Sequence, residues 1–220
     1  MPTLPAAVLW DMDGTLINTE PLWIGAETDL VTAHGGVWTH EDGLSLVGNP
    51  MALSAETLRN RGVDLPVEQI VDHLNVKVAA GVAAATPWQP GARELLDELA
   101  AAGVPMALVT SSYQILSEPF AAVAGCFDVI VSGDTVTNPK PDPEPYLTAA
   151  AQLGVPIEQC VAVEDSRAGI ASALASGART VGVEVFQPIA PRPGLVRVTD
   201  LRELDVQRFA EIAAGAVPTH

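Results

Sequence analysis

The stretch Ala7-Val8-Leu9-Trp10-Asp11-Met12-Asp13-Gly14-Thr15 decides the fold. A short apolar run, the right length for one buried strand, leads into two aspartates two positions apart and then a glycine. On an extended backbone Asp11 and Asp13 point the same way, and two adjacent like charges raise one pKa unless a cation lies between them. Gly14 permits a sharp turn just past the strand, where open α/β sheets bind their ligands. Taken alone, the stretch also fits a strand that leaves the core through an acidic turn.

The composition indicates a globular protein with one sizeable core and room for a smaller insert, at 220 residues. Hydrophobic residues make up 48% and charged residues 17%, which excludes a disordered acidic polymer. No apolar run reaches the ~18 residues that span a bilayer and no signal-peptide pattern is visible, so we expect a cytoplasmic location. The net charge of -16 argues against nucleic acid or an anionic membrane as a partner. Cys126 and Cys160 lack the spacing of a metal or redox motif, so reduced thiols are expected.

The region after Asp13 lacks strand patterns and reads as helices with short breaks. We expect helices that start at Thr19-Glu20-Pro21, at Thr39, near Met51 and at Pro66, the second of them ending near Gly48-Asn49-Pro50. Together they predict a small helical domain over residues 16–87, inserted into a core domain of residues 1–15 and 88–220.

Beyond the linker at residues 86–91 the pattern alternates between helix and strand. Strands are expected at residues 104–109, 127–131, 159–163, 179–183 and 196–198, and helices at 91–102, 113–123, 143–152, 166–176 and from about 200. Strands separated by helices of this length predict an α/β protein with a doubly wound, Rossmann-like parallel sheet and right-handed crossovers.

Polar residues follow the predicted strands, and a parallel sheet gathers them at one edge. They are Asp11 and Asp13, then Thr110-Ser111-Ser112, then Lys140 between two prolines, then Glu164-Asp165-Ser166. Each set has an ordinary alternative, because hydroxyls and aspartates also cap helices and lysines are common on surfaces. Two acidic pairs, a hydroxyl cluster and one restrained cation together indicate a metal site that handles phosphate.

This combination resembles the haloacid dehalogenase superfamily over most of the chain. Its first motif, D-x-D-G-T, is Asp11 to Thr15; its second, a hydroxyl after a strand, is Thr110; its third is Lys140; its fourth is the Glu164-Asp165 pair. The four motifs occur in order and at predicted strand ends. The helical insert is similar to the small cap of the beta-phosphoglucomutase and phosphoglycolate phosphatase branch.

The resemblance implies a phosphatase that forms an aspartyl phosphate. Asp11 is then the nucleophile, and Asp13 protonates the leaving alkoxide and later takes a proton from the attacking water. Lys140 bridges the phosphate and Asp11, while the Thr110 hydroxyl and the Ser111 amide hold phosphate oxygens.

The resemblance also implies a cofactor and a substrate class. Mg2+ would be held by Asp11, the backbone carbonyl of Asp13 and Asp165, with Glu164 either a further ligand or a support behind the ligands. Gly169 stands where some relatives have a further acid. The expected partner is a small phosphorylated metabolite, and a monomer is plausible for a capped enzyme of this size.

Three other functions compete with this interpretation. Dehalogenase members lack the second aspartate of the first motif, whereas Asp13 is present here. A sugar-phosphate mutase of the beta-phosphoglucomutase type usually has a histidine where this chain has Trp23, and a cap arginine after the Leu-x-Gly stretch where it has residues 49–51. A non-catalytic phosphate-binding protein would not need both aspartates. Phosphate hydrolysis is therefore the leading prediction.

Overall fold

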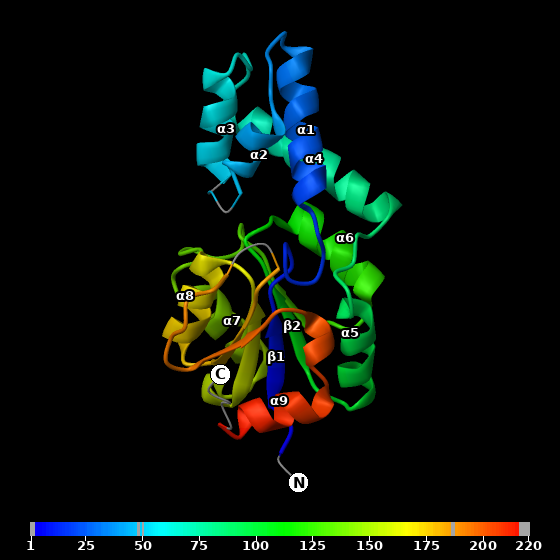
Figure 1. The fold of residues 1–220 in the computed structure, drawn as a ribbon, viewed down its shortest axis with the longest axis vertical. Helices are drawn as coiled ribbons and strands as arrows, with labels where there is room; N and C mark the ends of the chain where they lie inside the picture. Colours follow the sequence, from blue (N-terminus) through cyan, green and yellow to red (C-terminus); the bar gives the residue numbers. More distant parts are fainter. Residues whose placement is uncertain (1–2, 48, 50, 186–187, 216–220) are drawn as a thin grey trace. The chain divides into compact units, whose positions relative to one another are not determined.

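The computed structural model describes residues 3–47, 49, 51–185 and 188–215. Figure 1 shows the fold as a ribbon. The chain divides into two compact units, one made of Met1–Asn18 with Pro87–His220 and the other of Thr19–Thr86. Among the described residues, no helix combines the length and the apolar character needed to cross a membrane.

The first unit is built on a sheet whose strands follow the order β3-β2-β1-β4-β5-β6. The strands are β1 (Ala7–Trp10), β2 (Met106–Val109), β3 (Val129–Val131), β4 (Cys160–Glu164), β5 (Arg179–Val183) and β6 (Leu195–Val198). Every neighbouring pair is parallel. The strands β1, β2 and β4 are buried along their whole length, which is why the sequence shows them as short unbroken apolar runs. The predicted α/β fold with a doubly wound parallel sheet is confirmed.

Helices cover both faces of this sheet (Figure 1). They are α5 (Ala92–Ala101), α6 (Gln114–Ala124), α7 (Glu144–Leu153), α8 (Arg167–Ser176) and α9 (Val206–Ala213). Ala7 and Leu9 of β1 share a buried cluster with Tyr146 of α7. On the other face, the Trp10 ring meets the Phe209 ring of α9 edge to face, with centroids 5.8 Å apart. Because side chains alternate along a strand, Asp11 follows Ala7 and Leu9 toward the face covered by α7.

The expectation of one final helix from about residue 200 is wrong. A 3-10 turn, η2 (Leu201–Glu203), comes first and α9 begins only at Val206. Each has its own aspartate cap, since the Asp200 side chain accepts from the Arg202 amide and the Asp205 side chain from the Arg208 amide. Two strong N-caps five residues apart start two separate elements.

The second unit is helical, with α1 (Glu20–Ala33), α2 (His40–Leu44), α3 (Met51–Asn60) and α4 (Val67–Ala84). Thr39 and Asp42 start α2 with reciprocal side-chain to backbone hydrogen bonds, a complete capping box. The second helix is shorter than predicted, because it ends at Leu44. The predicted end near Gly48-Asn49-Pro50 falls partly on residues 48 and 50, which lie outside the described residues.

The two crossings between the units run side by side within the sheet unit. The Asn18 amide donates to the Pro87 carbonyl at 2.8 Å, and the Gln89 amide donates to the Leu16 carbonyl at 2.8 Å. Ile17 and Trp88 form an antiparallel bridge between these hydrogen bonds. The Gln89 side chain also donates to the Gly14 carbonyl at 2.9 Å. The loop that follows β1 is thus hydrogen-bonded to the segment that returns from the helical unit.

A buried carboxylate in the helical unit makes its stability depend on pH. Burial raises the pKa of Glu27 to about 7, although the Trp38 indole donates to it at 3.1 Å. A raised carboxyl pKa gives stability that is fully present below the unfolded value of about 4.5 and is lost as pH rises through 7. We therefore expect Glu27→Gln to stabilise the protein by about 2 kcal/mol at pH 8 and by little at pH 5. Urea unfolding at both pH values measures this. Glu41→Gln, at an exposed glutamate of α2, is the matched control, and equal effects of Glu27→Gln at both pH values would contradict the assignment.

Candidate active site

The candidate site lies at the carboxyl ends of β1 and β4, where the strand order of the sheet reverses. Trp10 is in register with Val163, so the next residues along each strand, Asp11 and Glu164, come level with each other. The Asp11 amide donates to the Val163 carbonyl at 3.0 Å, which extends the ladder to the first aspartate. The sheet register alone brings the first and fourth sequence motifs together.

Lys140 is the cation between these carboxylates. Its Nζ donates to Asp11 Oδ1 at 2.7 Å, to Glu164 Oε1 at 2.6 Å and to the Val109 carbonyl at 2.8 Å. The lysine side chain is only 3% exposed, and those of Asp11 and Glu164 are 9% and 0% exposed. Lys140 is therefore a buried lysine with all three ammonium hydrogens engaged, and the alternative of an ordinary surface lysine is wrong.

Glu164 accepts so many hydrogen bonds that its carboxylate has no lone pair left for a metal. Its Oε1 accepts from Lys140 and from the Tyr146 hydroxyl at 3.0 Å. Its Oε2 accepts from the Asp165 amide at 3.1 Å, and from the Ser166 amide and hydroxyl at 3.1 and 3.0 Å. A carboxylate offers about four lone-pair positions. Of the two roles predicted for Glu164, this saturation favours support behind the ligands.

Gly169 explains how the Glu164 carboxylate fits under the first turn of α8. A Cβ atom at residue 169 would come within 1.6 Å of Glu164 Oε1. Ser166 caps the same helix, since its Oγ accepts from the Gly169 amide at 2.9 Å. The absence of an acid at this position thus has a steric cause, because no side chain fits between this backbone and the carboxylate.

Asp165 is held by the loop after β1. The Thr15 hydroxyl donates to Asp165 Oδ1 at 3.0 Å. Gly14 has a φ of +90°, and a Cβ there would lie 2.2 Å from Asp165 Oδ2. Both glycine properties are needed here, the left-handed backbone and the missing side chain. The D-G-T segment therefore contacts and positions Asp165, the second acid of the fourth motif.

Asp13 is bound to the hydroxyl cluster that follows β2. Its Oδ2 accepts from Ser112 Oγ at 2.8 Å and from Thr110 Oγ1 at 3.2 Å. Tyr113 is the N-cap residue of α6 and makes no side-chain capping bond, so the alternative that these hydroxyls cap the helix is wrong. Ser111 is exposed, and its predicted contact to phosphate stays a prediction.

The site has more negative than positive charge. Burial raises the pKa of Asp11 to about 7, with contributions from Glu164 and Asp13 that Lys140 opposes. Burial also raises the pKa of Asp165 well above its usual range, and Asp11 and Glu164 add to the effect. The ammonium of Lys140 is disfavoured by burial, but the Asp11 and Glu164 carboxylates raise its pKa above the ordinary value. Two buried carboxylates and the partly buried Asp165, with one lysine among them, form a site that a second cation would stabilise.

The donor set fits a hard divalent cation. Asp11, Glu164 and Asp165 each offer a carboxylate oxygen, and these oxygens lie within 4.8 Å of one another. Oxygen ligands are the ones that Mg2+ and Ca2+ prefer. Because the oxygens of Glu164 are already engaged, Asp11 and Asp165 are the carboxylates best suited to contact a metal.

The structure gives a place in the site to residues for which the sequence predicted no role. Thr15, Ser112 and Tyr146 all contact the acidic residues of the site. Tyr146 is fully buried, and Lys140 Nζ lies 5.2 Å from the centre of its ring. A hydrophobic position on α7 is the only sequence signal for Tyr146, and that signal is shared by every core residue.

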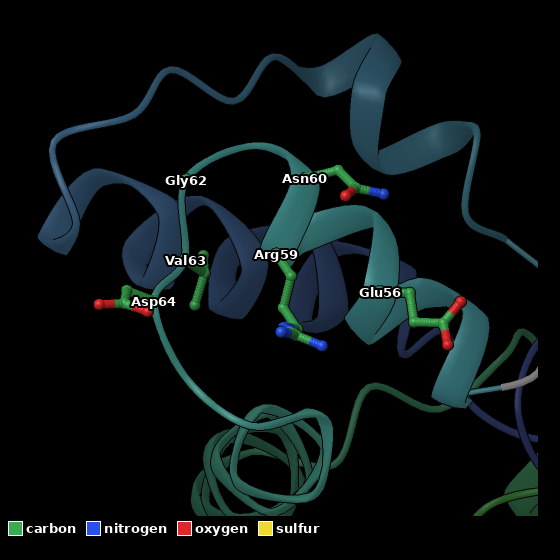
Figure 2. Close-up of a pocket in the computed structure, with 6 residues that line it drawn as sticks. All are labelled: Glu56, Arg59, Asn60, Gly62, Val63 and Asp64. Carbon is green, nitrogen blue, oxygen red and sulfur yellow. The ribbon is translucent and has the colours of Figure 1, made fainter.

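A separate pocket of about 450 Å³ lies within the helical unit (Figure 2). It is lined by Glu56, Arg59, Asn60, Gly62, Val63 and Asp64. None of these is a predicted site residue. The polar side chains that line it are exposed, and in Figure 2 Glu56 and Asp64 flank Arg59. The pocket is thus a solvated hollow in the surface, without a buried polar group to fix a ligand.

Known proteins are similar to this chain over most of its length. Protein CbbY of Rhodobacter capsulatus is 35% identical over 192 residues, which cover 80% of this chain and 83% of that protein. Hexitol phosphatase A of Escherichia coli is 32% identical over 181 residues, covering 80% of this chain and 81% of the relative. The solved structure of a CbbY mutant from Rhodobacter sphaeroides in complex with xylulose-(1,5)bisphosphate matches with a TM-score of 0.80 at 28% identity, covering 91% and 96% of the two chains.

The model of the haloacid dehalogenase-like hydrolase family matches residues 8–183, from β1 to the end of β5. This range includes all four motifs and the helical insert. The resemblance drawn from the motifs is thereby confirmed, and the chain belongs to the haloacid dehalogenase-like hydrolase family.

Proposed function

We propose that the protein is a Mg2+-dependent phosphatase that hydrolyses a small phosphate monoester through an aspartyl phosphate on Asp11. The observation that carries the proposal is the buried ion pair of Asp11 and Lys140 at the sheet reversal, beside a second aspartate held by two hydroxyls. Phosphoryl transfer requires mainly positioning and cancellation of negative charge. A bound divalent cation would supply further cancellation of the phosphate charge, with Asp11, the Asp13 carbonyl and Asp165 as its protein ligands.

In the first step an Asp11 carboxylate oxygen attacks phosphorus, and the bond between phosphorus and the ester oxygen breaks. Asp13 gives its proton to the departing alkoxide. Lys140, already hydrogen-bonded to Asp11 Oδ1, reduces the repulsion between this carboxylate and the phosphate. The alcohol leaves, and the phosphoryl group stays on Asp11.

In the second step Asp13 takes a proton from a water molecule, and the water oxygen attacks the phosphorus of the aspartyl phosphate. The bond between phosphorus and the Asp11 oxygen breaks, which releases inorganic phosphate and restores both aspartates. The Thr110 hydroxyl and the Ser111 amide, next to the start of α6, are the proposed phosphate donors.

Phosphorylated sugars and sugar alcohols are the proposed substrate class. The support is the activity for which hexitol phosphatase A is named and the xylulose bisphosphate bound in the structure of the CbbY mutant. The net charge of -16 repels any anionic substrate over long range, so binding depends on local positive charge in the site.

Phosphate release from a panel of monoesters tests the proposal. The panel contains hexitol phosphates, pentulose phosphates and bisphosphates, and phosphoglycolate, each with Mg2+ and with EDTA. We expect release of inorganic phosphate from at least one member with Mg2+, and a loss of at least about 100-fold with EDTA that added Mg2+ restores. Isomerised sugar phosphate without phosphate release would instead identify a mutase. A folded protein that produces neither contradicts the proposed activity.

A further inference from the structure

The Ser112 hydroxyl makes a shorter hydrogen bond to Asp13 than the Thr110 hydroxyl does. Ser112 Oγ lies 2.8 Å from Asp13 Oδ2, and Thr110 Oγ1 lies 3.2 Å from the same oxygen. Ser112 is about nine-tenths buried. A buried hydroxyl that donates to a carboxylate fixes its orientation, because either group would lose a hydrogen bond on rotating away.

Thr110 has only one hydroxyl hydrogen to give. Its Oγ1 accepts from the Ser112 amide at 3.0 Å and donates to Asp13. In the proposed function this hydrogen is needed by the phosphate, and it cannot point at the phosphate and at Asp13 together. When Thr110 turns to the phosphate, Ser112 is the hydroxyl that continues to hold Asp13.

Backbone hydrogen bonds to the end of β3 and the segment after it hold the turn that contains Ser112. The Ser112 carbonyl accepts from the Gly133 amide at 2.9 Å. A Cβ at residue 133 would lie 2.1 Å from the Ser111 carbonyl oxygen, so only glycine permits this approach. The Thr110 amide in turn donates to the Val131 carbonyl at 2.9 Å. Ser112 therefore lies in a turn whose backbone is held by hydrogen bonds to residues 131 and 133, as positioning of a catalytic group requires.

We propose that Ser112 is a positioning residue for the general acid and base of the reaction. Its hydroxyl donates to Asp13 Oδ2, which keeps that oxygen an acceptor and directs the transferable proton to Oδ1. This inference rests on the proposed phosphatase function. The two neighbouring hydroxyls then have different roles. The Thr110 hydroxyl donates to the phosphate, and the Ser112 hydroxyl orients Asp13 for proton transfer.

The test compares leaving groups of different basicity in one variant. An alkyl phosphate releases a strongly basic alkoxide that needs the Asp13 proton, whereas 4-nitrophenyl phosphate releases a stable phenolate that does not. We expect Ser112→Ala to lower kcat/KM about 10-fold or more for the alkyl phosphate and less than about 3-fold for the nitrophenyl ester. The quantity compared is kcat/KM because it reports the first irreversible step, before Asp13 acts as a base on the intermediate.

Two further variants distinguish the loss of the hydroxyl from a loss of folding. Ser112→Cys preserves the volume but donates weakly, and should show the same contrast between substrates. Ser112→Thr keeps the hydroxyl and should recover most of the activity on the alkyl phosphate. Equal losses on both substrates, or none on either, would overturn the role of Ser112. The alkyl phosphate used is the member of the monoester panel that the wild type cleaves best, and a wild-type protein that cleaves no member would instead overturn the phosphatase function on which the inference rests.

Discussion

Replacing Asp11 by asparagine is expected to lower phosphate release by at least about 1000-fold while leaving the protein folded. An amide oxygen is a poor nucleophile toward phosphorus, so the aspartyl phosphate does not form. Asparagine has the size of aspartate and still accepts from Lys140 through its carbonyl oxygen. The change also removes one of three neighbouring carboxylates, so we expect the melting temperature to stay equal or to rise.

Phosphate release with Mg2+ and thermal unfolding, measured on the same preparation, check both halves of this expectation. Asp97→Asn is the matched control, because Asp97 is an exposed aspartate of α5 whose salt-bridge partner is Arg93. It should keep wild-type activity. If Asp11→Asn retained activity within tenfold of wild type, the nucleophile would have to be another residue.

Replacing Lys140 by methionine is expected to damage both catalysis and stability. The substitution leaves the Asp11 and Glu164 carboxylates buried without their shared cation, which typically costs about 3–5 kcal/mol when one partner of a buried ion pair is removed. The lost charge should also lower kcat/KM by about 1000-fold, because Asp11 then approaches the phosphate without the lysine beside it. Urea unfolding in EDTA measures the first effect, and steady-state kinetics with Mg2+ measures the second.

A double variant separates the two effects. Lys140→Met combined with Glu164→Gln removes one of the two carboxylates that Lys140→Met leaves without a cation. The double variant should therefore be more stable than Lys140→Met and equally inactive. The coupling between the two sites in such a cycle is the measured quantity. An unchanged urea midpoint for Lys140→Met alone would show that the ion pair contributes nothing to stability.

The sequence predicted the site well where a polar residue directly follows a strand. The apolar runs of β1 and β4 fix where each strand ends, and in a parallel sheet the ends of neighbouring strands coincide. The sequence alone therefore predicts Asp11 and Glu164 at one edge of the sheet, and the register of Trp10 with Val163 agrees. The helix boundaries of the sheet unit were mostly within one or two residues for a related reason, since glycine ends α6, α7 and α8 in a left-handed conformation.

The supporting residues of the site could not be predicted in the same way. Tyr146 occupies an apolar position of α7, and only the packing of that helix against the sheet brings its hydroxyl to Glu164. Ser112 belongs to a hydroxyl cluster whose sequence is equally typical of a helix cap. Its hydrogen bond to Asp13 depends on the conformation of the turn after β2, which the sequence does not reveal. Contacts of this kind join residues about 20 to 100 positions apart, beyond the reach of local patterns.

The adjacent crossings at residues 16–18 and 87–89 have a consequence for how this chain could be rebuilt. Because a hydrogen bond joins Asn18 to Pro87, the whole segment of residues 19–86 occupies the place of a tight turn in the sheet unit. Replacing a long loop by a short one changes the entropy of closure by only a few tenths to a few kcal/mol. We therefore expect the helical insert to tolerate exchange, because a graft from a relative, joined at these two positions, would start and end at residues that already lie side by side.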